Sequence, residues 1–441
     1  MANAFYGQSG GVSAVINATA AGIIATARQH PTVFEKVYAG RDGILGALHE
    51  NLVDISEESA ETLELLLHTP GGAFGSCRHK LQNPNVTHDE YQRLIEVFRA
   101  HDIRYFFYNG GGDSQDTTRK IAQVAELMGY DLTCIGVPKT IDNDLPVTDN
   151  SPGFGSVAKY VAVSALEASF DIASMHKTST KVFVMEVMGR RSGWIAAAAG
   201  LAKDERELGP DIILVPEISF EPDAFLERVK QTVAKKGFCV VVTAEGIRDA
   251  SGQLLASAAN QDPFGHTQFG GVAPLLVDFI KQRFNYKCHW SVCDYLQRAA
   301  RHLASQTDVE QSYAVGKAAV EYAVAGLQSV MPAIVRTQSV PYQWEIKPVH
   351  ISEVASGEKN MPRHFMSKDG FSVTQAGLDY FAPLIAGEAY PPYRNGLPDY
   401  RKCRNRLVPR KLPEYFGRKD GVEDPVSCPV NSHAFRAPLG C

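Results

Sequence analysis

Apolar residues occur along this chain in short continuous runs, each followed by a glycine-rich turn and then by a segment with helical spacing. Residues 104–112, RYFFYNGGG, form one such run and turn, and Ile121, Val124, Ala125 and Met128 follow on one helix face. Continuous apolar runs are typical of strands that helices cover on both faces. Strands that alternate with helices predict an α/β fold with parallel sheets. The other segments expected to contain strands are 4–11, 132–140, 181–189, 211–217 and 238–246.

The 441 residues are enough for two such sheets, and we expect two lobes. The amino-terminal lobe is expected to comprise residues 1–153 and about 298–345. The carboxy-terminal lobe is expected to comprise residues from about 154 to 297 and 346–400. From about residue 400 the chain is basic and interrupted by prolines, so we expect residues 401–441 to form a tail that wraps the surface or is mobile.

Composition and charge exclude several classes of protein. Hydrophobic residues make up 44% of the chain and charged residues 21%, as in globular proteins rather than disordered or fibrous ones. The net charge is -5 and no run of like charges occurs, so we expect no nucleic-acid partner. Residues 2–27 carry no charge but contain many amide, hydroxyl and glycine residues, which favours a buried strand, turn and helix over a membrane span. We therefore expect no membrane association.

The spacing of cysteines and histidines narrows the location and the chemistry further. The eight cysteines include no CxxC pair, which is typical of reduced thiols in a cytoplasmic protein. The first residues, MANAFYGQSGG, lack the basic and apolar regions of a signal peptide. The thirteen histidines show no HxxxH or HExxH spacing, and no GxSxG motif occurs. We therefore expect neither a zinc site nor a serine hydrolase.

Three glycine-rich turns form the first candidate site. Residues 110–114, GGGDS, come directly after an apolar run and begin a helix, where backbone N–H groups and the helix N-terminus favour an anion. Neither the GxGxxG of dinucleotide-binding proteins nor a P-loop is present. Residues 10–11 and 71–78 are further glycine-rich turns, and the second contains an arginine. Together they indicate a phosphate site, whereas each alone could be an ordinary strand-to-helix turn with a side-chain cap.

The densest group of reactive side chains is PKTIDND at residues 138–144, which contains a lysine, a threonine hydroxyl and two carboxylates. Carboxylates beside a phosphate site hold Mg²⁺ or take a proton from a hydroxyl nucleophile. A neighbouring lysine can neutralise the charge that develops on a transferring phosphoryl group. The alternative is a turn rich in aspartate and asparagine that caps a helix.

Two further motifs follow expected strands. Residues 188–193, MGRRSG, place an arginine just beyond the carboxyl end of a strand, where α/β sheets bind ligands and where a guanidinium suits phosphate. Residues 244–246, AEG, place a carboxylate that could bond sugar hydroxyls at a similar position. Tyr295 and Arg298 share one helix face. For each of these the alternative is an ordinary surface position.

Taken in order, these motifs resemble those of the 6-phosphofructokinase family, and within it the diphosphate-dependent branch. The resemblance extends from about residue 6 to residue 384. The matching motifs are GQSGG at 7–11, GSCR at 75–78, GGGDS at 110–114, PKTIDND at 138–144, EVMGR at 186–190, AEG at 244–246 and YLQR at 295–298.

The resemblance implies two Rossmann-like parallel-sheet lobes with the active site between them. The diphosphate site belongs to the amino-terminal lobe and the sugar-phosphate site to the carboxy-terminal lobe. The implied reaction is the Mg²⁺-assisted, reversible transfer of a phosphoryl group from diphosphate to the 1-hydroxyl of fructose 6-phosphate. Its products are fructose 1,6-bisphosphate and phosphate, as in glycolysis and gluconeogenesis.

The resemblance also implies roles for individual residues. Asp142 takes the proton from the 1-hydroxyl, Thr140 holds that hydroxyl, and Lys139 contacts the transferring phosphoryl group. The implied catalytic residues are Asp142, Lys139, Thr140, Asp113 and Arg190. The implied diphosphate-binding residues are Gly11, Arg78, Gly111, Asp113, Ser114 and Lys139. The implied fructose 6-phosphate-binding residues are Thr140, Ile141, Asp142, Lys181, Met188, Gly189, Arg190, Glu245, Tyr295 and Arg298. The implied Mg²⁺ ligands are Asp113 and Asp144.

Two positions distinguish the phosphoryl donors that the family uses. Asp113 and Lys139 stand where relatives that use ATP have glycine, and a carboxylate at position 113 would repel the α-phosphate of ATP. Lys181 stands where relatives carry an arginine that reaches the sugar phosphate of a neighbouring subunit. The resemblance therefore implies a homodimer or a larger homo-oligomer with a shared sugar-phosphate site.

Two departures from the family pattern keep other functions open. Gly112 replaces a residue near the Mg²⁺, and His289 replaces an arginine that binds the sugar phosphate, for which Lys287 could compensate. The alternatives are an ATP-dependent 6-phosphofructokinase and, in a different class, a non-catalytic regulatory subunit with the same fold.

Overall fold

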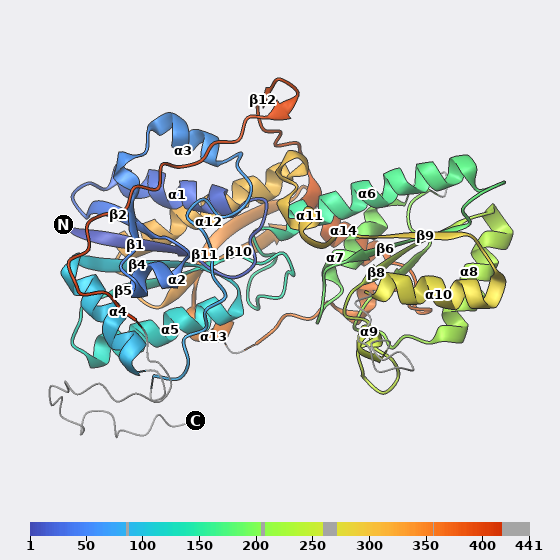
Figure 1. The fold of residues 1–441 in the computed structure, drawn as a ribbon, viewed down its shortest axis with the longest axis horizontal. Helices are drawn as coiled ribbons and strands as arrows, with labels where there is room; N and C mark the ends of the chain where they lie inside the picture. The colour runs from blue at the N-terminus through green and yellow to red at the C-terminus, as the bar shows by residue number, and fades with distance from the viewer. Residues whose placement is uncertain (85–87, 204–207, 259–270, 356, 417–441) are drawn as a thin grey trace.

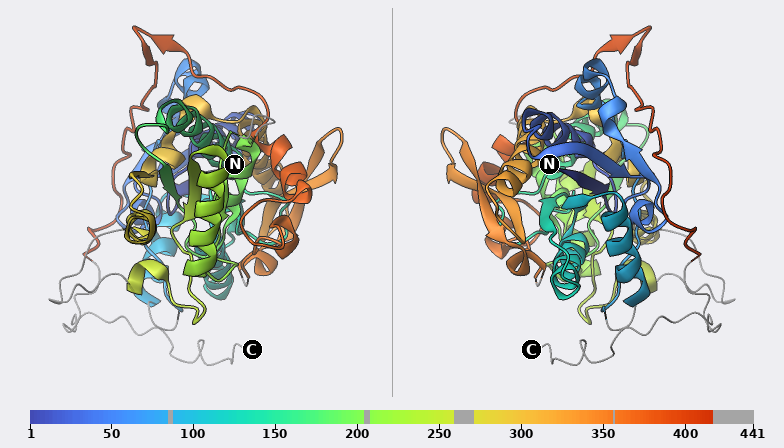
Figure 2. Two further views of the ribbon diagram at one scale, coloured as in Figure 1. Left: turned by 90° about the vertical axis from the view of Figure 1, so that its right-hand side faces the viewer. Right: turned by 90° about the vertical axis from the view of Figure 1, so that its left-hand side faces the viewer.

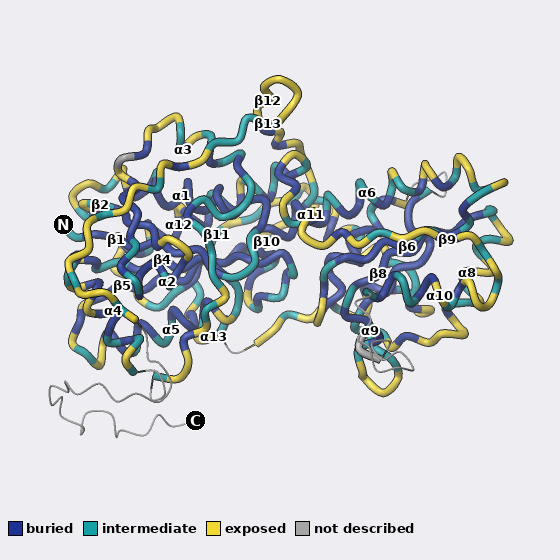
Figure 3. The backbone as a smooth tube through the Cα atoms, viewed as in Figure 1, coloured by how far each residue is buried: buried dark blue, intermediate teal, exposed yellow. Residues whose placement is uncertain are grey.

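The computed structural model describes residues 1–84, 88–203, 208–258, 271–355 and 357–416. Figure 1 shows them as two lobes that lie side by side, each with a sheet at its centre and helices around it. The strands are mostly buried, whereas the outer faces of many helices are exposed (Figure 3). The expected α/β fold with two parallel-sheet lobes is confirmed.

In the described part of the chain, the first lobe has a seven-stranded sheet in the order β11-β10-β5-β4-β1-β2-β3. Its strands are β1 (Ala2–Gln8), β2 (Phe34–Gly40), β3 (Leu52–Asp54), β4 (Ile103–Gly110), β5 (Thr133–Pro138), β10 (Val330–Gln338) and β11 (Gln343–His350). The five central strands are parallel, and the edge strands β3 and β11 are antiparallel to their neighbours. Its helices are α1 (Ile16–Gln29), α2 (Ile44–Leu48), α3 (Ala60–Leu66), α4 (His88–Ala100), α5 (Gly112–Leu127), α12 (Gln306–Val324) and α13 (Ile351–Ala355).

The second lobe has a smaller parallel sheet in the order β7-β8-β6-β9. Its strands are β6 (Val182–Val187), β7 (Ile212–Leu214), β8 (Cys239–Ala244) and β9 (Cys288–Val292). Its helices are α6 (Phe154–Met175), α7 (Trp194–Ala198), α8 (Pro222–Lys236), α9 (Leu255–Ala258), α10 (Val272–Phe284), α11 (Asp294–Ala299) and α14 (Gln375–Phe381). Short 3₁₀ helices occur at Ile55–Glu57, Ala199–Ala202, Arg301–Leu303, Arg363–Phe365 and Ala382–Ile385, and a small hairpin is formed by β12 (Tyr393–Arg394) and β13 (Leu397–Pro398).

Two glycines allow α12 to pack closely against α1 in the first lobe. A Cβ atom added to Gly22 would lie 2.3 Å from the backbone oxygen of Tyr313, and one added to Gly316 would lie 2.2 Å from that of Thr19. Only glycine permits such a close approach of two helix backbones. This contact places α12 beside the parallel strands of the first sheet, although it follows the whole second lobe in sequence.

The expected boundary at residue 345 is wrong. We expected residues 346–400 to join the second lobe, but β11 pairs with β10 in the first sheet along its whole length, from Gln338 opposite Gln343 to Val330 opposite His350. The two strands form a hairpin, and such local pairing keeps β11 and α13 with the first lobe. The chain returns to the second lobe only after α13 (Figure 1).

Residues 401–416 of the expected tail run along the surface of the first lobe (Figures 1 and 2). The backbone N–H of Val408 donates to the oxygen of Leu52 at 2.9 Å, next to β3, and the N–H of Lys411 donates to the buried carboxylate of Glu50 at 2.6 Å. The remaining part of that expected tail, residues 417–441, lies outside the described residues. Within the described ranges, no helix combines the length and apolar character that a membrane crossing requires.

Candidate active site

Three of the sequence motifs meet at one edge of the first sheet. The strands β1, β4 and β5 are parallel neighbours, so the turns that follow them leave from the same edge. The backbone N–H of Lys139 donates to the oxygen of Gly110 at 3.1 Å, and the hydroxyl of Ser114 donates to that of Ser9 at 2.8 Å. The structure therefore brings together the glycine-rich turns at 10–11 and 110–114 and the loop at 138–144.

The third glycine-rich turn joins them through backbone contacts. The N–H of Gly10 donates to the oxygen of Cys77 at 2.9 Å, and the hydroxyl of Ser76 donates to the oxygen of Gly10 at 2.7 Å. Below this turn, the buried amide of Asn17 donates to the oxygen of Thr69 at 2.7 Å and accepts from the N–H of Ala73 at 3.0 Å. This network fixes the segment that ends in Arg78.

Cations from both lobes surround Gly11. The ammonium of Lys139 donates to the backbone oxygen of Gly11 at 2.6 Å. A Cβ atom on Gly11 would lie 2.7 Å from Nη1 of Arg298 and 3.4 Å from Nη2 of Arg78, so both guanidinium groups lie close to this residue. Arg298 belongs to α11 of the second lobe, and its guanidinium lies 3.9 Å from the ring centroid of Tyr295. The positive charge required for an anion site therefore lies between the lobes.

The carboxylate of Asp142 lies in the same region. Burial and the neighbouring Asp144 raise the pKa of Asp142 to about 6, whereas the ammonium of Lys139 acts in the opposite direction. Burial also lowers the pKa of Lys139 to about 8, although Asp142 and Asp144 favour its charged form. The hydroxyl of Thr140 accepts from the N–H of Asp142 at 3.1 Å and so fixes this part of the loop. Such opposed shifts in one buried cluster are typical of catalytic sites.

The second lobe contributes the motifs at 188–190 and 244–246, which follow the adjacent parallel strands β6 and β8. The N–H of Glu245 donates to the oxygen of Val187 at 2.9 Å. A Cβ atom on Gly246 would lie 2.1 Å from the oxygen of Arg190, so glycine permits the two turns to pack together. The carboxylate of Glu245 also raises the pKa of Asp142, although burial and Asp144 contribute more.

The structure also places five other predicted site residues, two at the start of α5 and three in the loops that follow β5 and β6. Gly111 and Ser114 begin α5, and the side chain of Ile141 packs into the apolar core of the second lobe. Ile141 can therefore face a ligand only through its backbone. Met188 is held by its N–H, which donates to the side chain of Gln297 at 3.3 Å, and Gly189 has a φ of 139°.

Lys181 is not brought to this center within the same chain. It precedes the first residue of β6, whereas Met188 follows the last, so the two lie at opposite ends of the strand. Its ammonium donates to the backbone oxygen of His176 at 2.5 Å. Any contact of Lys181 with a sugar phosphate would therefore be with that of another subunit.

Asp113 is exposed and forms an ion pair with Lys80 at 2.6 Å. Lys80 was not predicted from the sequence, because it lies two residues beyond the motif at 75–78. Its charge, close to Arg78 in sequence, was the signal that could have indicated it. Asp144 differs from Asp113, because its Oδ1 is buried and has no hydrogen-bond partner among the described residues. No cluster of three or more histidine, cysteine or acidic side chains with metal-binding geometry occurs in the described ranges.

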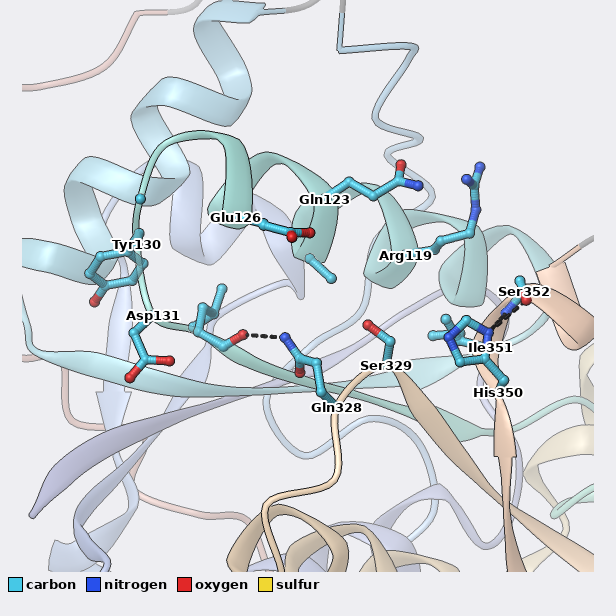
Figure 4. A pocket seen from close by; sticks show the side chains of 13 residues that line it. Arg119, Gln123, Glu126, Tyr130, Asp131, Gln328, Ser329, His350, Ile351 and Ser352 are labelled. Atoms are coloured by element: carbon cyan, nitrogen blue, oxygen red, sulfur yellow. Dashed lines mark hydrogen bonds between the residues drawn. The ribbon is translucent and has the colours of Figure 1, made fainter. Parts of the chain in front are cut away.

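A separate cavity of about 720 Å³ opens at the other end of β5, beside the carboxyl end of α5 (Figure 4). Its lining includes Glu126, Asp131, Gln328, Ser329 and His350. Because the motifs of the candidate site follow the carboxyl ends of the strands and this cavity borders the start of β5, the cavity is not part of that site.

Comparison with known proteins agrees with this geometry. The sequence pattern of the family described as "Phosphofructokinase" matches residues 3–323. The pyrophosphate–fructose 6-phosphate 1-phosphotransferases of Methylococcus capsulatus and Halomonas elongata are 59% and 58% identical to this chain, over 94% of it and 99% of each relative. The crystal structure of a pyrophosphate-dependent phosphofructokinase from Marinobacter aquaeolei has a TM-score of 0.87 and 58% identity, and the match covers 95% of this chain and 100% of that one.

Proposed function

The chain belongs to the phosphofructokinase family, and on this premise we propose that it is a diphosphate-dependent 6-phosphofructokinase. It transfers a phosphoryl group reversibly from diphosphate to the 1-hydroxyl of fructose 6-phosphate. The observation that carries this proposal is the buried group of Asp142 and Lys139 beside Gly11, with Arg78 and Arg298 at the same point. Relatives named for this activity share more than half of the residues of this chain.

Phosphoryl transfer depends on positioning and charge neutralisation more than on covalent chemistry. Asp142 accepts the proton of the 1-hydroxyl as its oxygen attacks the terminal phosphorus of diphosphate, and phosphate leaves. The hydroxyl of Thr140 orients the attacking group. Lys139 and Arg78 neutralise the charge that develops on the transferring phosphoryl group. Gly11, Gly111 and Ser114 bind the donor through the backbone and hydroxyl groups at the edge of the first sheet.

The residues present fit a role for Mg²⁺. Asp144 offers a buried carboxylate oxygen that lacks a hydrogen-bond partner among the described residues, and magnesium in proteins often needs only one or two carboxylates besides substrate phosphates and water. When bound, the ion supplies positive charge to the phosphates. We propose Asp144 as its principal ligand and keep Asp113, which faces Lys80, as the second.

The second lobe binds the acceptor in this proposal. Arg190 and Arg298 offer guanidinium groups to its phosphate, and Glu245 offers a carboxylate to its hydroxyls. Met188, Gly189 and Tyr295 complete the pocket wall. The donor and the acceptor therefore approach from different lobes and meet at Asp142, which explains why the catalytic loop lies where the lobes join.

The pH dependence of kcat/KM is expected to be bell-shaped. Asp142 must be ionised to accept a proton, so activity falls as the pH decreases through about 6, its raised pKa. Lys139 must be charged, so activity also falls as the pH increases through about 8, its lowered pKa. Initial rates measured from pH 5 to 9.5 at low substrate concentration test this. A flat acid limb down to pH 5 would contradict the assignment of Asp142 as base.

A homodimer with a shared site is the second part of the proposal. Strand β9 is an edge of its sheet and exposes Trp290 and Val292, which are 46% and 47% accessible. His289 lies opposite Phe183 on β6, and the N–H of Lys181 donates to the oxygen of Lys287 at 2.8 Å, so these basic residues gather at the same edge. A second copy that covers this edge would bury the apolar residues and receive Lys181 at its sugar-phosphate site.

The oligomeric state tests this part directly. Sedimentation equilibrium of the full chain is expected to show a dimer or a larger assembly, and Trp290→Glu is expected to shift it toward the monomer. A monomeric wild-type chain at micromolar concentration would contradict the shared site. The cytoplasmic location expected from the cysteine spacing stays part of the proposal.

A further inference from the structure

After α13 the chain crosses from the first lobe to the second (Figure 1). Lys359 follows the last residue of α13 by four positions. Its backbone N–H donates to the oxygen of Asp144 at 2.7 Å. Its backbone oxygen accepts from the indole N–H of Trp194 at 3.1 Å, at the start of α7. The backbone of one residue thus ties the catalytic loop to a helix of the second lobe.

The side chain of Lys359 returns to the same loop. Its ammonium donates to Oδ1 of Asn143 at 3.1 Å and to the backbone oxygens of Thr148 and Asp149 at 3.1 and 2.7 Å. These three acceptors match the three donors of an ammonium group. The ammonium also lies 5.2 Å from the ring centroid of Trp194. Lys359 therefore holds both the beginning and the end of the loop that follows the catalytic motif.

Asn143, which Lys359 contacts, stands between Asp142 and Asp144 and has a φ of 54°. Its side chain also accepts from the N–H of Ser151 at 3.0 Å and donates to the hydroxyl of Tyr380 at 3.0 Å. Asparagine adopts the left-handed region more readily than most residues, and the hydrogen bonds of its side chain hold Asn143 there. Since the directions of both neighbouring carboxylates depend on this conformation, the contacts of Asn143 determine where the proposed base points.

Keeping a lysine in this place has a cost. Burial lowers the pKa of Lys359 to about 7, although the carboxylates of Asp149 and Asp144 favour the charged form. An apolar side chain could fill the same space beside Trp194 without that penalty. Such a replacement would lose the three hydrogen bonds from the ammonium group to the loop.

We infer that Lys359 is a positioning residue for phosphoryl transfer, which holds the Asn143 turn so that Asp142 and Asp144 keep their orientation when the lobes bind their substrates. The inference rests on the proposed function. Lys359 touches neither substrate in this account and acts through the loop. Misplacement of a reacting group by about 1 Å can reduce a rate about 100-fold, so the loss of these contacts should appear in kcat.

Lys359→Met, which keeps a long unbranched side chain one atom shorter than lysine and removes its donors, tests the inference. Kinetics of the full-length variant with diphosphate and fructose 6-phosphate are expected to show kcat lowered between about 10- and 100-fold. Both KM values are expected to stay within about threefold of wild type, because the binding residues are intact. Wild-type activity with diphosphate is measured first. Its absence would refute the proposed function, whereas an active wild type with an unaffected variant would refute only the role of Lys359.

Lys236→Met is the matched control. Lys236 is a partly buried lysine at the end of α8, pairs with Asp211 at 2.7 Å and lies 4.2 Å from the ring centroid of Phe238. It precedes β8, whereas Glu245 follows that strand, so the two lie at opposite ends of it. Its replacement is expected to lower the melting temperature without changing kcat by more than about twofold. Equal losses of kcat in Lys359→Met and Lys236→Met would show that Lys359 contributes only to the stability of the fold, and would overturn the inference.

If Lys359→Met does not fold, Tyr380→Phe tests the same contacts of the Asn143 turn. The hydroxyl of Tyr380 donates to the oxygen of Asp149 at 2.6 Å and accepts from Asn143, so its removal loosens the same turn while the ring stays packed. We expect kcat to fall about 3- to 10-fold with unchanged KM values. An unchanged kcat in this folded variant would overturn the inference.

Discussion

Replacing Asp142 by asparagine is expected to lower kcat with diphosphate by about 10³-fold, because the amide cannot accept the proton of the 1-hydroxyl. The replacement has nearly the same shape, and the N–H of residue 142 still donates to Thr140. The KM values for both substrates should therefore stay within about threefold of wild type. Steady-state formation of fructose 1,6-bisphosphate measures both quantities.

The acid limb of the pH profile supplies a second readout for the same variant. If Asp142 is the base, the residual activity of Asp142→Asn should no longer fall as the pH decreases through about 6. Asp211→Asn is the control, since Asp211 is a buried carboxylate of the second lobe that pairs with Lys236. Full activity of Asp142→Asn would show that another group accepts the proton.

The second large effect is expected at the donor site. Replacing both Asp113 and Lys139 by glycine should lower turnover with diphosphate by at least about 10²-fold, because Lys139 supplies positive charge beside both Gly11 and Asp142. The same change removes the carboxylate that repels a longer donor. Turnover with ATP is therefore expected to rise relative to turnover with diphosphate. Parallel assays with the two donors give this ratio.

The single variants separate the two contributions. Lys139→Gly should account for most of the loss with diphosphate, whereas Asp113→Gly should mainly affect discrimination and should also free Lys80 from its ion pair. Lys120→Ala is the control, since it removes a lysine that pairs with Asp116 on the same helix. Alanine is used there because glycine inside α5 would destabilise the helix. Unchanged diphosphate kinetics in the double variant would show that neither residue selects the donor.

The sheets and the catalytic edge could be predicted from the sequence because their signals are local. The strands β1, β4 and β5 lie in mainly apolar runs, and the turns after β1 and β4 carry the glycines that an anion site favours, whereas β2 contains Glu35 and Lys36 and was not expected. Parallel strands place such turns at one edge, so the meeting of Gly11 and Lys139 follows from the order of the strands. The contribution of Arg298 from the other lobe was available only through the resemblance to a family, since Tyr295 and Arg298 alone are typical of any helix surface.

The remaining features depend on contacts that no local pattern encodes. β11 stays with the first sheet because it pairs with β10, and its alternating polar and apolar residues fit an exposed edge as well as many other places. Lys80 meets Asp113 across 33 residues, and Lys359 meets Asn143 across 216. Lys359 lies in no motif. The residue before it, Glu358, forms an ion pair with Arg191, which no local sequence pattern predicts either.

The most direct test of the central claim is the formation of fructose 1,6-bisphosphate from fructose 6-phosphate and Mg²⁺ by the purified full-length chain, with diphosphate in one assay and ATP in the other. We expect turnover with diphosphate and little or none with ATP, because we assign Asp113 and Lys139 to the donor site. Comparable or faster turnover with ATP would contradict the assignment of the donor. The absence of turnover with both donors would contradict the assignment of Asp142 and Lys139 as catalytic residues.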